Sequence, residues 1–329
     1  MPIKNQENDY PTEKPPTNHP PGLIHCLFSG GINKTVGETN IVSFYTTILD
    51  LISRKYLRVK IKTVWYKREY GDIIPKYEIT MKRNARRHYK ELNKFEVNVL
   101  SCLTSLEIHG IIDLLNYEEL FKKRVRANKF QRNYKEWSEN IHKKYFEDNE
   151  FKYFNPNKSD KLKTLGMILM LIMIFTLILA MVIEAWLISI SFLTFISGIF
   201  LVLSPQKDLG GWSEEGMELK EKWEDFKYYL IKDLRKTRGK NRFNNLWNQY
   251  LQYVIALEIG ETFNINLIEN IKNSNMKETS GYLEANLFDQ YGGFDLIKKI
   301  VKEGLKADGS YESKKRYNTS GNFVPGYGI

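Results

Sequence analysis

The most pronounced pattern in the chain is an apolar run over residues 165–203, which contains a single charged residue, Glu184. A continuous helix of about 39 residues would be about 58 Å long, nearly twice the ~30 Å hydrocarbon core of a bilayer. Two spans, 165–183 and 185–203, fit that thickness if the chain turns at Glu184. The turn leaves this carboxylate in water, whereas a position in the bilayer centre would be costly. The pattern therefore predicts a two-helix transmembrane hairpin.

Two other structures compete with this hairpin. A central helix of a large soluble protein would also be apolar, although wholly apolar runs in such helices rarely exceed about 14 residues. A re-entrant loop is the second competitor, because the turn lacks the Gly or Pro that is usual in tight connections. Folding the run about Glu184 places Thr176 near Thr194 and Ala180 near Ser189.

The charges that flank the run predict its orientation. No Lys or Arg occurs at the turn, where Trp186 fits the aromatic belt at headgroup level. Lysines occur on both flanks, at Lys152, Lys158, Lys161, Lys163 and Lys207. The positive-inside rule then places both flanks, and hence both termini, in the cytoplasm. The first 22 residues contain no apolar core of a signal peptide, so we expect a multi-pass protein of the cell membrane with cytoplasmic soluble parts.

Before the run, we expect a disordered lead over residues 1–21, which is polar and rich in proline, and then a folded domain over 22–110. Apolar residues repeat at helical spacing at Ile41, Tyr45, Ile48 and Ile52. Thr39 or Asn40 precedes them and can cap the helix. A core-facing helix is therefore predicted over 41–54.

A two-stranded ribbon is predicted directly after this helix. Leu57, Val59 and Ile61 alternate with basic residues, which is the period of a half-buried strand. A second strand at 77–81 follows the polar tip KREYGD, and a helix with Leu92, Phe95, Val99 and Cys102 or Leu103 comes next. Helix, basic ribbon and helix in this order predict a winged-helix-like α+β unit.

A winged helix on DNA places a helix in the major groove and the wing against phosphates. The predicted outer face of the 41–54 helix carries Asn40, Ser43, Thr47, Asp50 and Arg54. These residues offer little for reading bases, so the sequence favours a protein-binding use of the unit over a nucleic-acid-binding use.

Residues 111–160 form a charged connector, with one long helix predicted over 117–148. Two basic clusters lie in and before it: Lys122, Lys123, Arg124, Arg126, Lys129, Arg132 and Lys135 in the first, and Lys82, Arg83, Arg86, Arg87 and Lys90 in the second. Each basic residue near an anionic leaflet contributes about 1 kcal/mol, so we expect these clusters to contact anionic lipid headgroups. The apolar run and its immediate flanks complete the membrane segment, 161–204.

The part after the membrane segment, 205–306, is predicted to be a helical cytoplasmic domain, with a flexible tail at 307–329. A helix over 213–234 has an apolar stripe of Leu219, Trp223, Phe226 and Leu230. A second helix in LWNQYLQYVIALEIG should pack antiparallel to it. Weaker helices are predicted at 267–272 and 294–305.

Composition adds little specific chemistry. The chain has 329 residues, a net charge of +10 and only two cysteines, Cys26 and Cys102, which excludes a disulfide framework and a cysteine-rich zinc module. The five histidines show no ligand spacing, and His25–Cys26 has no second pair. No phosphate-binding loop, dinucleotide fingerprint, nucleophile elbow or metalloprotease motif occurs. We therefore nominate no catalytic, cofactor-binding or metal-binding residues, expect no cofactor, and favour a non-enzymatic protein.

Several stretches resemble the carboxy-terminal half of the YciQ-like family of uncharacterised predicted membrane proteins. They are TTILDLISRKYLRVK, the paired apolar spans, SEEGMELKEKWEDFKYYL and LWNQYLQYVIALEIGE, and together they cover roughly residues 20–262. Members of that family usually carry a secretion signal, an extracytoplasmic domain and another span before this region. The resemblance implies a membrane protein and implies no enzymatic activity.

Pattern and resemblance together predict a mainly α membrane protein. A transmembrane hairpin is flanked by a winged-helix-like α+β cytoplasmic domain and a carboxy-terminal helical domain. The favoured hypothesis is a membrane-anchored scaffold or adaptor with a protein partner of unknown identity. The alternative is a membrane-tethered regulator that binds nucleic acid through its winged-helix-like unit.

Overall fold

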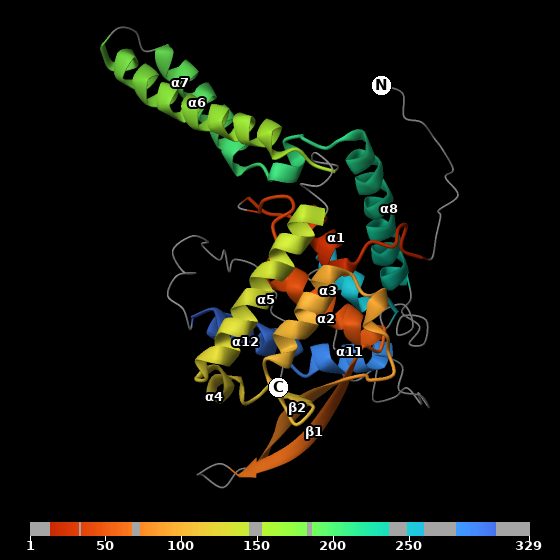
Figure 1. Cartoon of the computed structure of the whole chain (residues 1–329). Helices are drawn as coiled ribbons and strands as arrows, with labels where there is room; N and C mark the ends of the chain where they lie inside the picture. Colours follow the sequence, from red (N-terminus) through yellow and green to blue (C-terminus); the bar gives the residue numbers. More distant parts are fainter. Residues whose placement is uncertain are drawn as a thin grey trace.

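The computed structural model describes residues 14–32, 34–67, 73–144, 153–182, 186–236, 249–259 and 281–306. These residues are mostly helical and include one small antiparallel sheet (Figure 1). The helices of the first half are α1 (Pro21–Phe28), α2 (Ile41–Ser53), η1 (Tyr89–Glu91), α3 (Lys94–Thr104), α4 (Tyr117–Phe121) and α5 (Arg124–His142). The remaining helices are α6 (Pro156–Val182), α7 (Leu187–Leu203), η3 (Gln206–Asp208), α8 (Glu214–Lys236), α11 (Gly281–Gln290) and α12 (Gly293–Lys306).

Helix α2 lies at the centre of the fold. Of the two predicted capping residues, Thr39 and Asn40, Asn40 caps the helix: its side chain accepts hydrogen bonds from the backbone N–H groups of Val42 and Ser43. Helices α1, α3, α11 and α12 and strand β1 (Leu57–Lys67) all contact it, and every residue from Ser43 to Ser53 is buried. The helix is therefore covered on all sides.

This burial corrects the predicted outer face of the helix. Ser43, Thr47 and Asp50, which we expected to be exposed, are all buried. Helix α1 covers Ser43 and Thr47, and it approaches so closely that a Cβ atom on Gly22 would lie 2.4 Å from the Oγ1 atom of Thr47. Polar residues on this face hydrogen-bond within the helix instead: Thr47 donates to the carbonyl oxygen of Ser43 at 2.8 Å.

The predicted ribbon is present and is longer than expected. Strand β1 pairs antiparallel with β2 (Ile73–Arg83), in a register that places Leu57 opposite Arg83 and Lys62 opposite Glu78. Strands β3 (Glu107–Ile108) and β4 (Ile111–Asp113) extend the sheet, whose order is β1-β2-β4-β3. Ile79 and Met81 are buried, as the strand pattern predicted. Residues 68–72 at the ribbon tip lie outside the described residues.

The single long helix predicted over 117–148 is two helices. Helix α4 ends at Phe121, and α5 begins at Arg124 after Lys123, whose backbone is extended. The break turns the buried face of α4 back onto α5, so that the rings of Phe121 and Phe130 meet edge to face at 5.2 Å. A straight helix could not bring both faces onto the same core.

The core is continuous across the apolar run. Buried side chains from α1, α2, α3 and α5 form one cluster with those of α8, residues 250–259, α11 and α12. Trp223 of α8 packs on Tyr253 and Phe226 packs on Tyr250, which gives the antiparallel pair that we predicted. Helix α12 matches the helix expected at 294–305, whereas the one expected at 267–272 lies outside the described residues. Segments 22–110 and 205–306, which we treated as separate units, thus share one set of buried side chains.

The end of the predicted lead also contacts this core. The indole N–H of Trp223 donates to the hydroxyl of Thr17 at 3.1 Å, and the hydroxyl of Tyr253 donates to the carbonyl oxygen of His19 at 3.1 Å. Pro20 and Pro21 are buried, and Pro21 begins α1. Proline at a first helical position lacks only an N–H that would have no partner there. Residues 17–21 are therefore part of the folded structure.

Helices α6 and α7 pack against each other and project from the rest of the molecule (Figure 1). They run antiparallel: Gly166 lies against Gly198 and Leu201, and near the other end Ser191 donates to Thr176 at 2.8 Å. Thr176 thus meets Ser191, whereas Thr194 donates to its own helix backbone. The turn expected at Glu184 lies outside the described residues.

Candidate functional site

The most distinctive surface is the apolar exterior of α6 and α7. Within α6, the segment Pro156–Ala180 is long and apolar enough to cross a membrane, and its most apolar 18-residue stretch has a mean hydropathy of 2.4. It is the one such helix among the described residues, because α7 is shorter. Large side chains point outward along both helices; among them Phe175, Phe192 and Phe200 are 63%, 64% and 69% exposed. Exposed apolar surface this extensive marks a membrane or interaction site.

A polar junction ties the base of this pair to the core. The side chain of Gln206 is buried, and its amide NH₂ donates to Asp160 of α6 at 3.0 Å while its oxygen accepts from the backbone N–H of Val36 at 2.7 Å. The backbone N–H of Asn155 donates to Gly211 at 2.7 Å, so the chains entering and leaving the pair are bonded directly. Trp212 stacks on Phe28 at 5.8 Å beside them. The pair is therefore anchored at its base by several directional contacts.

A second polar cluster surrounds His25. Its Nδ1 atom lies 3.0 Å from the carbonyl oxygen of Ala256, and the side-chain amide of Asn40 donates to Nε2 at 2.9 Å. A neutral imidazole protonated on Nδ1 satisfies both contacts. Burial lowers the pKa of His25 to about 4, so the ring stays neutral at physiological pH. This histidine joins α1, the cap of α2 and the helix around residue 256.

Next to it, Glu258 holds the loop that follows α1. Its carboxylate accepts from the backbone N–H of Gly30 at 3.1 Å and pairs with Lys34. Burial raises the pKa of Glu258, but Lys34, His25 and the N–H of Gly30 outweigh burial and keep it below its ordinary value. Cys26, adjacent in sequence to His25, points elsewhere, and burial raises its thiol pKa to about 12. The adjacent His–Cys pair is thus two separate buried side chains.

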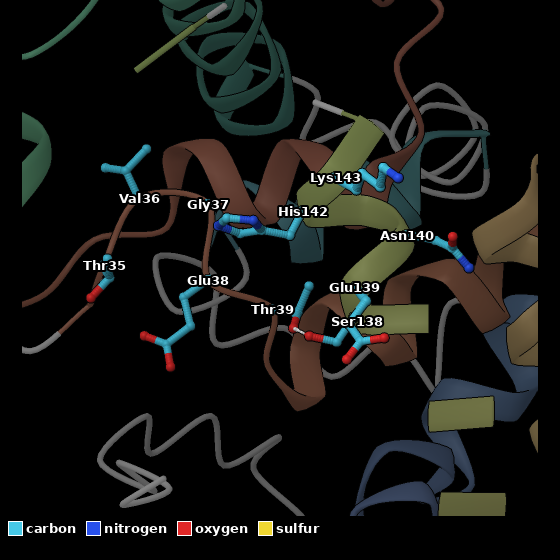
Figure 2. Close-up of a pocket in the computed structure, with 10 residues that line it drawn as sticks. All are labelled: Thr35, Val36, Gly37, Glu38, Thr39, Ser138, Glu139, Asn140, His142 and Lys143. Atoms are coloured by element: carbon cyan, nitrogen blue, oxygen red, sulfur yellow. Dashed lines mark hydrogen bonds between the residues drawn. The ribbon is translucent and has the colours of Figure 1, made fainter. Parts of the chain in front are cut away.

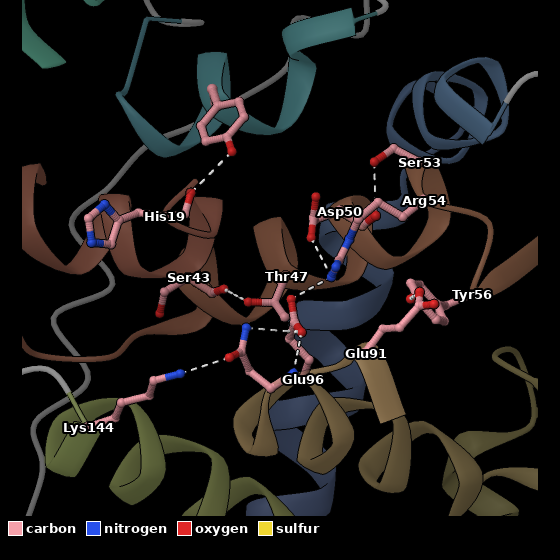
Figure 3. Close-up of polar contacts among 12 residues, drawn as sticks. His19, Ser43, Thr47, Asp50, Ser53, Arg54, Tyr56, Glu91, Glu96 and Lys144 are labelled. Atoms are coloured by element: carbon pink, nitrogen blue, oxygen red, sulfur yellow. Dashed lines mark hydrogen bonds and ion pairs between the residues drawn. The ribbon is translucent and has the colours of Figure 1, made fainter. Parts of the chain in front are cut away.

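A third cluster lies at the far end of α2 (Figure 3). The guanidinium of Arg54 lies 2.8 Å from Asp50 and also pairs with Glu96, the capping-box residue of α3. Burial raises the pKa of Asp50 to about 6; Arg54 opposes the rise and Glu96 adds to it. One cation shared by two nearly buried carboxylates fixes α2 against α3. The cluster has the contacts of a structural ion pair.

An open polar depression of about 790 Å³ lies between the loop 35–39 and the end of α5 (Figure 2). A hydrogen bond between the hydroxyls of Thr39 and Ser138 joins its two walls. Its charged lining residues, Glu38, Glu139 and Lys143, carry both signs, so charge selects no single ligand. Across the described parts of the chain, no three His, Cys, Asp or Glu side chains gather where they could hold a metal ion.

Sequence reasoning named no site residues, and none of these clusters shows a nucleophile paired with a base. It missed the partners of His25, Lys34 and Arg54, because these partners come from distant elements: Ala256, Glu258 and Glu96, respectively. One local signal was available: Asn93 and Glu96 have the spacing of a capping box, which placed Glu96 at the start of α3.

The His25 cluster predicts a pH-dependent stability. In the folded protein the pKa of His25 is about 4, below the ordinary 6.5. The contribution of His25 to the free energy of unfolding is therefore complete above pH 6.5 and is lost as pH falls toward 4. Asp50 and Asp289 have the opposite effect, because burial raises the pKa of each to about 6. Their contribution to the free energy of unfolding is complete below pH ~4 and is lost as pH rises through 6. His25→Leu leaves Ala256 O and the Asn40 amide without their partner.

We expect His25→Leu to lower the free energy of unfolding by about 2–4 kcal/mol at pH 7.5, and the difference from the parent protein to shrink at pH 4.5. Denaturant unfolding of the full chain in detergent, followed by tryptophan fluorescence, measures both values. The exposed His88→Leu is the control. An equal deficit at both pH values would show that His25 is not a buried neutral base.

Comparison with known proteins bears on the whole chain. Neither the curated proteins nor the solved structures contain a significant match to it. The family model described as "Predicted membrane protein (DUF2207) C-terminal domain" matches residues 7–267. This match confirms the resemblance to the YciQ-like membrane proteins and covers most of the chain, including α1 to α8 but not α11 and α12. The chain therefore belongs to the DUF2207 family of predicted membrane proteins, whose carboxy-terminal domain it contains.

Proposed function

We propose that the protein is a membrane-anchored cytoplasmic adaptor whose α6–α7 pair forms a two-span transmembrane hairpin. One observation carries the proposal. An exposed apolar helix pair lies, in the sequence, between two segments that form a single shared core. The family match supports membrane localisation. The topology, the compartment and the adaptor role are inferred from the geometry below.

The dimensions of the pair fit a bilayer. The apolar part of α6 begins at Leu165 and gives about 27 Å of helix, and α7 gives about 26 Å, close to the ~30 Å hydrocarbon core. Small residues let the backbones approach: Gly166 faces Gly198 where the two helices touch. The hydroxyl of Ser191 has Thr176 as its partner inside the pair, so it need not face lipid.

The shared core supports an even number of crossings. Helices α1 to α5 precede the pair, whereas α8, α11 and α12 follow it, yet α11 and α12 both contact α2. Parts of one packed core must lie on one side of a membrane. A single crossing by α6 and α7 would separate them and expose the buried faces of both halves. Two crossings, or none, keep the core intact.

Lysines at the base of the pair support a cytoplasmic core and headgroup contacts there. Lys158 and Lys161 are exposed on the first turns of α6, and Lys163 donates to the carbonyl oxygen of Ile32 at 3.2 Å. We expected two basic clusters to contact lipid. The cluster that begins at Lys82 lies at the end of β2, and the other begins beside α4. Both β2 and α4 lie away from α6 and α7 (Figure 1). We therefore assign anionic headgroups to the basal lysines and leave the distant clusters for other partners.

The ribbon is the surface that we assign to a protein partner. Arg58, Lys60 and Lys62 are exposed along β1, and Lys82 is exposed opposite Arg58. Strand β1 is an edge of the sheet. Helix α11 covers the start of this edge, where the N–H of Val59 donates to Glu284 at 2.9 Å, and no strand pairs beyond that point among the described residues. An extended acidic segment could add beside β1, with backbone pairing for affinity and charge for selectivity.

The same geometry weakens the nucleic-acid alternative. We still propose that α2, the ribbon and α3 form a winged-helix-like unit. However, α2 is covered on every side by other elements and cannot enter a DNA groove. Only the ribbon would be left to contact phosphates. No observation favours duplex DNA over an acidic protein segment at this ribbon.

Cysteine labelling of cells that express the full chain tests the topology. Glu184→Cys should react with an impermeant maleimide added outside, whereas Lys161→Cys and Asp208→Cys should react only after permeabilisation. The parent chain is the background control, since Cys26 and Cys102 are buried. Protection at 184 would contradict the hairpin: with 208 labelled from outside it indicates one tilted span, and with 208 protected it indicates a re-entrant loop.

Site-specific photo-crosslinking tests the partner surface. A benzophenone residue at position 63, on the exposed outer half of β1, should yield a discrete crosslinked protein in cells. Lys60→Glu/Lys62→Glu should abolish that product, because the basic face is reversed. Lys299→Glu/Lys302→Glu on exposed positions of α12 makes the same charge change and should have no effect. A product that survives the ribbon reversal, or forms equally from position 217 on α8, would refute this assignment.

A further inference from the structure

A pocket of about 500 Å³ opens where α2 ends and β1 begins. Arg54, Lys55, Tyr56, Arg87, Glu91 and Tyr282 contribute to its lining. These residues come from the end of α2, the segment after β2 and helix α11. The volume lies in the range of small-molecule sites, roughly 300–1,000 Å³, and exceeds what a bare inorganic anion needs.

Lys55 occupies a backbone position that favours glycine. Helix α2 ends in a Schellman motif: the N–H of Tyr56 donates to Leu51 O at 2.8 Å, and the N–H of Lys55 donates to Ile52 O at 2.9 Å. The φ angle of Lys55 is +64°, in the left-handed region where a side chain is strained. Among the described residues, its ammonium group makes no hydrogen bond or ion pair. The left-handed conformation ends helix α2, and a lysine at this position, where glycine is favoured, places a cation at the pocket.

Two cations of this pocket, Lys55 and Arg87, have no carboxylate partner among the described residues. Arg54 is already paired with Asp50 and Glu96, both behind it in the protein interior. Glu91 accepts the hydroxyl of Tyr56 at 2.9 Å. Arg87 lies over the Tyr56 ring at 5.8 Å, and its guanidinium makes no ion pair within the described residues. Lys55 and Arg87 are thus two cations without an ion pair, and they share the pocket with one carboxylate, that of Glu91.

We propose that this pocket binds the phosphate of a soluble, mononucleotide-sized phosphomonoester. Lys55 and Arg87 hold the phosphate, for which the planar, multi-donor guanidinium is well suited. Tyr282, 39% exposed on α11, offers an aromatic face for the ring system of the ligand. The base of β1 and α11 lies away from α6 and α7 (Figure 1), so headgroups of the anchoring bilayer do not reach the pocket. The site does not depend on the adaptor role, whereas the exclusion of bilayer headgroups rests on the proposed α6–α7 anchor.

Calorimetric titration of the full chain in detergent tests the proposal, with AMP, inorganic phosphate, adenosine and dihexanoyl phosphatidic acid as probes. AMP should bind at least tenfold more tightly than phosphate or the lipid, and adenosine should not bind measurably. Affinity for AMP should fall as salt rises. Equal binding of phosphate and AMP would refute the mononucleotide-sized ligand, and preference for the lipid would refute a soluble one.

Two variants locate the site and separate binding from folding. Lys55→Gly should weaken AMP binding at least tenfold and yet raise the melting temperature by about 2 °C, because glycine relieves the left-handed strain. Arg87→Gln should weaken binding to a similar degree, and Lys129→Gln on the exposed face of α5 should leave it unchanged. The absence of AMP binding at millimolar concentration, or unchanged binding in both pocket variants, would overturn the proposal.

Discussion

The constraint on which the structure depends is that one packed core is completed by chain segments on both sides of an apolar helix pair. The chain builds α1 to α5, leaves the core through α6, returns through α7, and then supplies α8, α11 and α12 to the same buried cluster. Large apolar side chains along the pair are left exposed by the rest of the described residues. In the proposed hairpin, hydrocarbon removes this surface from water without separating the two halves of the core.

Several local features follow from that constraint. The chain enters and leaves the pair at adjacent points, where Asn155 bonds Gly211 and Gln206 bridges Asp160 and Val36. These contacts are short-range and directional, so they fix the base of the pair to the body. His25 then links α1, the cap of α2 and the chain at Ala256, which joins the first and last parts of the core. The ribbon and α11 lie away from the pair (Figure 1), and Lys55 and Tyr282 of α11 both line the pocket where α2 ends.

Sequence reasoning succeeded where the signal is local. The apolar run, the Asn40 cap of α2, the β1–β2 alternation and the stripes of α8 and α12 all depend on neighbours within a few turns or residues, and each element is present. It failed where distant segments decide the outcome. The polar face of α2 looked exposed because nothing in its own sequence reveals that α1 covers it through Gly22.

The same limit explains the candidate sites. Glu258 pairs with Lys34 from more than 200 residues away, and Tyr282 of α11 reaches the pocket beside Lys55. No spacing rule connects such positions. The helix break at Lys123 was equally hidden, because the charged sequence around it is compatible with a continuous helix, and only the packing of Phe121 on Phe130 requires the turn.

The most direct test of the central claim measures immersion depth along α7. Single spin labels at outward positions from Ile188 to Leu203 in the full chain, reconstituted in bilayers, report accessibility to oxygen and to a water-soluble nickel complex. A transmembrane hairpin predicts that oxygen accessibility relative to nickel rises to a maximum near Phe195 and falls again toward both ends of the helix. A uniformly shallow depth along α7, or a depth that changes in one direction only from Ile188 to Leu203, would contradict the two-span anchor.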